Sequence, residues 1–263
     1  MQDSRQNVIA HNRDAWDKLA REANEWTIPV SPAAIDAARR GDWRIYLTEE
    51  KTVPRDWFPS DLRGVDVLCL ASGGGQQGPI LAAAGASVTV FDNSAEQLRR
   101  DRFVAERDGL PIRTVQGDMR DLSAFAGASF DLIFHPVSNI FVPEVRPVWR
   151  ECYRVLRPGG ILMMGTVNPI EYIFDREVLD NEGKLVVRFP LPFSEAADLT
   201  PEERARAFGA DSPVEFSHTL EDQIGGQLDA GFVITGFFEA RRPDQPTAHY
   251  FPSYIATRAV KPG

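Results

Sequence analysis

The stretch that decides the fold is residues 65–92, which read VDVLCLASGGGQQGPILAAAGASVTVFD. It opens with an apolar run of strand length, Val65–Ser72, and passes through three glycines into a predicted helix, Gln76–Ala84. A second strand, rich in β-branched residues, follows at Ser87–Phe91. A strand, a helix and a second strand within about 30 residues form a βαβ unit, and its right-handed crossover places both strands parallel in one sheet.

The glycine turn and the acid after it predict a site for a nucleoside-containing cofactor. Gly73, Gly75 and Gly78 satisfy the pattern G-x-G-x-x-G. Glycine permits the backbone angles of a sharp turn and lets a ligand approach the main chain. Asp92 follows about 20 residues later at the tip of the next strand, where a carboxylate can accept hydrogen bonds from ribose hydroxyls. Glycine-rich turns also occur in α/β folds without nucleotides, so the complete order of elements carries this interpretation.

Composition and charge exclude several classes of protein. The chain has 263 residues, a hydrophobic content of 43% and a net charge of −9, which argues against nucleic-acid binding. No apolar run approaches the ~20 residues that cross a bilayer, and the polar N-terminus lacks the apolar core of a signal peptide. Cys69 and Cys152 are expected to be free thiols, and no metal-binding spacing is present. We therefore expect a cytoplasmic protein without a metal, nucleic-acid or membrane partner.

Residues 1–60 are predicted to form an N-terminal helical cap, and residues 61–263 to form the main α/β domain. Four of the five tryptophans lie in the cap, at Trp16, Trp26, Trp43 and Trp57. One interpretation is that they attach the cap to the domain. The other is that Trp16 or Trp26 forms a lid over the cofactor or lines an apolar substrate pocket.

Strands and helices alternate over residues 65–165, which predicts a doubly wound sheet. Such sheets bind ligands beyond the carboxyl ends of their strands. Small or polar residues follow four of the predicted strands, at Gly73–Gly75, Asp92, Asp118 and His135–Asn139. We expect these four tips to meet at one edge.

The last third of the chain departs from this alternation. Residues 168–215 contain five prolines and are predicted to be an insertion after the fifth strand. Thr219–Ala230 is predicted to be a helix with Ile224 and Leu228 turned inward. Two apolar strands follow, Phe232–Phe238 and Tyr254–Ala259, with no helix between them, so they should pair antiparallel.

This arrangement resembles the class I S-adenosylmethionine-dependent methyltransferases, particularly the ubiquinone and menaquinone methyltransferase-like group (methyltransferase type 11). The resemblance covers roughly residues 60–260. Its motifs are LCLASGGGQQ at 68–77, Asp92, Gly117–Met119, FDLIFHPVSN at 130–139 and RVLRPGG at 154–160. The first motif lacks the acid that usually precedes the glycines, and its ASGGGQQ form looks like the signature of a bacterial subgroup. The family implies a Rossmann-like, seven-stranded, mostly parallel sheet with an antiparallel last strand.

The resemblance implies methyl transfer from S-adenosyl-L-methionine, with S-adenosyl-L-homocysteine as product, to a small-molecule acceptor by direct in-line displacement. Its cofactor residues would be Ala71, Ser72, Gly73, Gly74, Gly75, Gln76, Gln77, Asp92, Asn93, Gly117, Asp118, Met119, His135, Pro136 and Val137. The acceptor pocket would include Trp16, Trp26, Asn139, Tyr172 and His218. His135 is the candidate general base, needed only if the nucleophile must lose a proton; otherwise it is a histidine hydrogen-bonded at the strand exit.

Two other functions compete with this interpretation. An NAD(P)-dependent oxidoreductase would share the glycine pattern and the acid, but the sequence has no Tyr-x-x-x-Lys pair. A non-catalytic protein that binds S-adenosylmethionine would account for the missing acid of the first motif. We expect a monomer or a homodimer.

Overall fold

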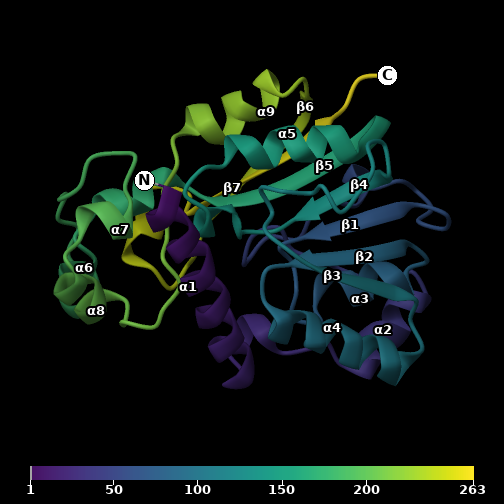
Figure 1. Cartoon of the computed structure of the whole chain (residues 1–263), viewed down its shortest axis with the longest axis horizontal. Coiled ribbons are helices and arrows are strands. Elements are labelled where there is room, and N and C mark those ends of the chain that lie inside the picture. Colours follow the sequence, from purple (N-terminus) through teal and green to yellow (C-terminus); the bar gives the residue numbers. More distant parts are fainter. Residues whose placement is uncertain (1) are drawn as a thin grey trace.

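The computed structural model describes residues 2–263, with side chains described from Val8 onward (Figure 1). Its centre is a seven-stranded sheet with the order β3-β2-β1-β4-β5-β7-β6. The strands are β1 Asp66–Leu70, β2 Ser87–Asp92, β3 Ile112–Gln116, β4 Phe130–His135, β5 Leu156–Val167, β6 Val233–Ala240 and β7 Tyr254–Val260. Strand β7 runs antiparallel to both β5 and β6, and the other neighbours are parallel. The predicted mostly parallel α/β sheet is confirmed.

Nine α-helical segments surround this sheet in the part of the chain that the structure describes (Figure 1). They are α1 Gln2–Arg21, α2 Pro32–Arg39, α3 Gln77–Ala83, α4 Ala95–Asp108, α5 Arg146–Val155, α6 Arg176–Glu182, α7 Glu195–Asp198, α8 Pro201–Ala207 and α9 Gly226–Asp229. Capping side chains begin several of them: Ser31 Oγ accepts from the Ala34 amide at 3.2 Å, and Ser94 Oγ accepts from the Gln97 amide at 3.1 Å. None of these helices is long and apolar enough to cross a membrane.

Alternate side chains of β1 belong to two cores, one on each face of the sheet. Val67 and Cys69 pack with α3, α4 and apolar residues between 45 and 62. Leu68 and Leu70 pack with α5 and the segment that follows β3. Burial on both faces explains the continuous apolar sequence of this strand. It also leaves the strand ends as the part of the sheet open to a ligand.

Helix α1 joins the core to the insertion across the carboxyl edge of the sheet (Figure 1). Its residue Asn12 exchanges two hydrogen bonds with the backbone of Val214, at 3.0 and 2.7 Å. On the other side, Asn93 Nδ2 donates to the Ile9 carbonyl at 3.1 Å. The helix therefore forms one wall above the strand tips.

The helix predicted at residues 219–230 differs from the expected one. It begins with a π-helical turn, Glu221–Gly225, and only then becomes α9. Leu228 is 52% exposed rather than turned inward, while Gln223 and Gln227 are buried. A π turn adds a residue to the turn and rotates the side chains that follow it, so the prediction from a regular 3.6-residue period is wrong here.

Candidate active site

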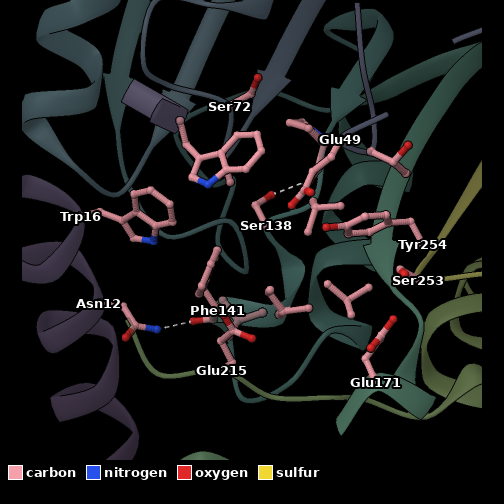
Figure 2. A pocket seen from close by; sticks show the side chains of 18 of the residues that line it. Asn12, Trp16, Glu49, Ser72, Ser138, Phe141, Glu171, Glu215, Ser253 and Tyr254 are labelled. Atoms are coloured by element: carbon pink, nitrogen blue, oxygen red, sulfur yellow. Dashed lines mark hydrogen bonds between the residues drawn. The ribbon is translucent and has the colours of Figure 1, made fainter. Parts of the chain in front are cut away.

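A cavity of about 710 Å³ lies along the carboxyl edge of the sheet (Figure 2). The tips of β1, β2 and β4 line one part of it, and α1 and the insertion line the rest. Figure 2 shows Ser72 at one end, Trp16 on one side, and Glu49 and Tyr254 opposite. Its volume falls within the range of ~300–1,000 Å³ typical of small-molecule sites. The predicted convergence of strand tips therefore produces a cavity large enough for a ligand.

Asp92 is held in place at this edge by two backbone amides. The Gly73 amide donates to Asp92 Oδ2 at 2.9 Å, and the Ser94 amide donates to Oδ1 at 2.9 Å. Burial raises the pKa of the Asp92 carboxyl to about 6, although these amide hydrogen bonds act in the opposite direction. The carboxylate lines the cavity in a fixed orientation, with lone pairs left for further donors.

The second and third glycines of the turn shape it without lining the cavity. Gly74 has a φ of +107°, and a Cβ there would lie 2.8 Å from the Trp26 carbonyl oxygen. Its amide donates to Oδ2 of the buried Asp101 at 3.0 Å, and the Gly75 carbonyl accepts from the Val30 amide at 2.9 Å. Gly74 and Gly75 are absent from the lining, whereas Gly73 belongs to it. These two predicted cofactor residues therefore lie outside the lining, where they pack against the backbone of Trp26 and Arg100.

Residues after β2 and β3 form the next part of the lining. Four of the predicted cofactor residues lie there, namely Asn93, Gly117, Asp118 and Met119. A Cβ at Gly117 would lie 2.3 Å from the Phe91 ring, so glycine alone fits this position. The Asp118 carboxylate is paired with Arg120 at 2.6 Å, a partner that the sequence prediction did not include.

Two buried hydroxyls in the lining have no hydrogen-bond partner among the described residues. Ser72 Oγ lies beyond the tip of β1, and Thr48 Oγ1 comes from the segment between α2 and β1. The side chains are 5% and 4% exposed. Buried polar groups are normally hydrogen-bonded, so these two atoms fit a ligand that carries polar groups of its own.

Gln76 and Gln77 line the cavity and also attach the N-terminal segment to it. Gln76 Nε2 donates to the carbonyls of Glu25 and Ile28 at 3.1 and 3.2 Å. Gln77 Oε1 accepts from the Tyr46 amide at 3.3 Å. Both glutamines therefore hold the backbone of residues 25–46 against the first turn of α3.

His135, the predicted general base, lies outside the lining of the cavity. Its side chain is fully buried below the strand tip and does not line the cavity, whereas the following Pro136 and Val137 do. The imidazole Nδ1 donates to the Leu70 carbonyl at 2.9 Å, and burial lowers the pKa of His135 to about 4. The ring lies on the core side of β4, and its Nε2 has no hydrogen-bond partner among the described residues. This placement fits the alternative of a hydrogen-bonded histidine at the strand exit.

Two predicted pocket residues are also buried away from the cavity. Asn139 Nδ2 donates to Gln223 Oε1 at 3.1 Å, and its Oδ1 accepts from Thr166 Oγ1 at 2.9 Å. His218 Nε2 donates to the Asn139 carbonyl at 3.1 Å. Neither residue is part of the lining, because this polar network behind β5 satisfies both. The other three predicted pocket residues, Trp16, Trp26 and Tyr172, do line the cavity.

Several polar side chains of the far part of the cavity were not predicted from the sequence. Glu49 forms an ion pair with Arg242 at 3.1 Å and a hydrogen bond with Tyr254. Glu171 and Glu215 come from the region after β5. No motif or spacing marks these five residues, and only the presence of an insertion hinted that this region covers the site.

Comparison with known proteins agrees with this geometry. A family model described as a methyltransferase domain matches residues 68–164. The uncharacterized methyltransferase YbaJ of Bacillus subtilis is 52% identical over 257 residues, which cover 97% of this chain and 98% of that protein. This chain belongs to the methyltransferases. The predicted enzyme class is thereby confirmed for this methyltransferase, in place of the oxidoreductase alternative.

Other similarities of the methyltransferase are more distant. A ubiquinone biosynthesis O-methyltransferase of Xanthomonas oryzae pv. oryzae is 35% identical over 122 residues, covering 46% of this chain and 51% of that enzyme. The crystal structure of a Mesorhizobium loti S-adenosylmethionine-dependent methyltransferase has a TM-score of 0.62 at 21% identity, covering 78% of this chain and 94% of that chain. The crystal structure of the Burkholderia thailandensis 1,6-didemethyltoxoflavin-N1-methyltransferase has a TM-score of 0.61 at 15% identity, covering 98% of this chain and 91% of that chain. These structures share the fold.

Proposed function

We propose that this methyltransferase transfers a methyl group to a small-molecule acceptor by direct in-line displacement. The observation that carries this proposal is the single cavity that runs from the strand tips to a chamber under the insertion. When bound, S-adenosylmethionine supplies an electrophilic methyl group on its sulfonium. The protein contributes the alignment of the acceptor and the exclusion of water, and positioning of this kind can supply much of the acceleration.

The strand-tip part of the cavity is the proposed cofactor site. Asp92 would accept the ribose hydroxyls, because its carboxylate is already oriented by amides and retains free lone pairs. Residues 117–119 and Asn93 would surround the adenine. The unpartnered hydroxyls of Ser72 and Thr48 suit the polar methionine part, together with Ala71, Gly73, Gln76, Gln77, Pro136 and Val137. These hydroxyls add contacts at the end of the site where the first motif lacks its acid.

The remaining part of the cavity is the proposed acceptor chamber. Trp16 packs edge-to-face on Phe141 at 5.2 Å, and both side chains line the chamber with Trp26 and Tyr172. Walls of this kind favour a small, partly apolar acceptor. The Burkholderia enzyme with bound 1,6-didemethyltoxoflavin and S-adenosylhomocysteine has a similar fold and acts on a small molecule, which supports the proposal.

The proposal includes the organisation of the chain and its setting. Residues 1–60 act as a cap or lid on the methyltransferase domain, 61–263, whose insertion at about 168–215 covers the acceptor. The protein works as a monomer or homodimer without a nucleic-acid or membrane partner, in keeping with its net charge of −9. The free, buried thiols of Cys69 and Cys152 support a cytoplasmic location.

Calorimetric titration with S-adenosylhomocysteine tests the cofactor part of the proposal, and a crystal soaked with it tests the placement. We expect one site per chain, with the ribose at Asp92 and open volume beside the sulfur that leads toward Tyr172. Absence of binding, or a ligand seated outside the strand tips, would contradict the proposal. Transfer of labelled methyl groups to members of a small-molecule panel then tests the activity itself.

A further inference from the structure

We propose that the methyl acceptor is an aromatic molecule with a weakly basic nitrogen, which Glu215 and Glu171 bind at the far end of the cavity. Glu215 also takes the proton that the methylated ring loses. The inference rests on the proposed function, because it assigns the acceptor of the same site.

The first observation is how charges are paired within the lining of the cavity. Arg242 lies 3.1 Å from Glu49. Arg188 lies 3.1 Å from Asp175 and 2.5 Å from Glu203. These three carboxylates therefore have cationic partners within the protein, and they leave no charge for a ligand to compensate.

Glu215 and Glu171 differ from that set. Glu215 Oε2 accepts from the Tyr172 hydroxyl at 2.7 Å, and Glu171 Oε1 accepts from Thr247 Oγ1 at 3.0 Å. Within residues 8–263, neither carboxylate has an ion-pair partner. Both line the cavity, and each keeps lone pairs that no protein donor fills. In this part of the chain no ion pair neutralises either enclosed carboxylate directly, and Arg176 and Arg204 act on Glu215 without forming an ion pair with it. The chamber therefore suits a ligand that brings positive charge or N–H donors and disfavours an anion.

The second observation is the aromatic wall beside Glu215. Tyr172 stacks on Phe193 with ring centroids 5.9 Å apart, and the centroid of the Phe189 ring lies 4.7 Å from that of Phe193. Aromatic faces attract cationic and planar groups. Figure 2 shows Glu171 and Glu215 on the side of the cavity opposite Ser72, so these carboxylates lie beyond the proposed cofactor site.

The third observation concerns basicity. Desolvation raises the pKa of the Glu215 carboxyl, while the Tyr172 hydroxyl, Arg176 and Arg204 act in the opposite direction. Glu195, whose amide donates to the Glu215 carbonyl at 3.2 Å, is the remaining charged group beside it. A carboxylate of raised pKa is a better match for a weakly basic aromatic nitrogen than for an alkylamine, because proton transfer is efficient between groups of similar pKa.

The chemical step balances with these groups alone. The nitrogen lone pair forms the new C–N bond while the C–S bond breaks, and that electron pair stays on sulfur to give S-adenosylhomocysteine. The methylated ring is then a cation, and the N–H of its other ring nitrogen gives its proton to the Glu215 carboxylate, which becomes a neutral acid and leaves a neutral product. Tyr172 acts as a positioning residue, because its hydroxyl orients Glu215 without touching the acceptor.

The test measures the binding of three planar probes to the full chain saturated with S-adenosylhomocysteine. Benzimidazole carries the weakly basic nitrogen, indole has the same shape without it, and benzoate is an anion. We expect benzimidazole to bind at least about tenfold more tightly than either of the others, the scale of one charge-assisted hydrogen bond. Equal affinities, tighter binding of benzoate, or no binding of benzimidazole up to its solubility limit would overturn the inference.

Variants assign the effect to the named carboxylates. Glu215→Gln should remove about tenfold of the preference for benzimidazole, while Glu202→Gln, an exposed acid on α8, should retain all of it. A preference that survives Glu215→Gln overturns the assignment. If Glu215→Gln does not fold, Glu171→Gln takes its place: it should also reduce the preference for benzimidazole that the wild type shows, and an unchanged preference overturns the assignment.

A pH profile separates positioning by Tyr172 from simple packing. Benzimidazole binding should rise with pH as Glu215 ionises. The hydrogen bond from Tyr172 stabilises the ionised form of Glu215, so its removal in Tyr172→Phe should raise the pKa of Glu215 and move the rise in binding to higher pH. An unshifted profile would overturn the positioning role. Binding of S-adenosylhomocysteine is measured on the same samples: if it is retained without a probe preference, only this inference fails, and if it is absent, the proposed function fails.

Discussion

The backbone amide of Gly73 donates to Oδ2 of Asp92 across 2.9 Å and joins the tips of β1 and β2. The bond links the glycine turn to the acid of the next strand, the two features from which the sequence predicted a cofactor site. Asp92 therefore has two roles in the proposal. It fixes the turn, and it presents its remaining lone pairs to the ribose.

Removing this carboxylate should weaken cofactor binding. We expect Asp92→Ala to reduce the binding free energy of S-adenosylhomocysteine by at least ~1 kcal/mol, the scale of a lost hydrogen bond. Calorimetry measures the change. Glu106→Ala, an exposed acid on α4, is the control and should bind normally. An unchanged affinity for Asp92→Ala would contradict the placement of the ribose.

The raised pKa of Asp92, about 6, makes cofactor binding pH-dependent. Hydrogen bonds from the ribose favour the ionised carboxylate, so the affinity for S-adenosylhomocysteine should rise from about pH 5 to about pH 7. Without the ligand the sign is opposite: a folded-state pKa above the usual 3.8 means that stability falls as the pH rises through about 6. Titrations at several pH values, with Asp92→Asn as the control that lacks the ionisation, check the first trend. A flat profile in the wild type would oppose it.

His135 should affect stability rather than methyl transfer. Its pKa is lowered from 6.5 to about 4, so between these pH values the imidazole is protonated in the unfolded chain and neutral in the folded chain. The stability present above pH 6.5 is lost as the pH falls toward 4, by up to ~3 kcal/mol. Urea unfolding between pH 7 and 4.5 should show a smaller loss for His135→Asn than for the wild type. If the free energy of unfolding falls equally with pH in the two proteins, the imidazole is already charged in the folded chain.

Gln76 should control the mobility of the segment over the glycine turn. Its amide group donates to the carbonyls of both Glu25 and Ile28, and each hydrogen bond contributes about 1 kcal/mol. Gln76→Ala should therefore increase amide hydrogen exchange in residues 24–30 by about tenfold. Gln116→Ala removes a comparable side-chain bond to the Asn93 carbonyl and should leave that segment unchanged. Equal amide hydrogen exchange of residues 24–30 in Gln76→Ala and Gln116→Ala would contradict the role of Gln76 in holding this segment.

Arg157 should contribute to stability without affecting the cofactor. Its guanidinium bridges Asp131 at 2.7 Å and Asp66 at 2.8 Å, at the amino ends of β4 and β1. These side chains are more than a third exposed, so Arg157→Ala should cost about 1 kcal/mol or less, and less still at high salt. Arg150→Ala, an exposed change on α5, is the control. A large loss of S-adenosylhomocysteine affinity in Arg157→Ala would oppose this purely structural role.

Much of the site near the strand tips could be predicted from local sequence. Asp92, Asn93, Gly117, Asp118 and Met119 line the cavity because each follows a strand whose end is set by the alternation of apolar runs and turns. The carboxyl ends of parallel strands all lie at the same edge of the sheet, so the order of elements along the chain is sufficient to place the residues at those ends. Side-chain direction was less predictable: Gly74 and Gly75 belong to the same turn but face packed backbone.

The amino-acid sequence by itself determined the βαβ unit, the family and the edge of the sheet that forms the cavity, because these depend on periodicity and on short motifs. Only the tertiary structure decided that His135, Asn139 and His218 are buried, and that Glu171 and Glu215 line the chamber without forming an ion pair among the described residues. Those outcomes depend on contacts between segments as distant as α1 and the insertion. No local pattern specifies such contacts, since each side chain's surroundings are supplied by residues far away in the chain.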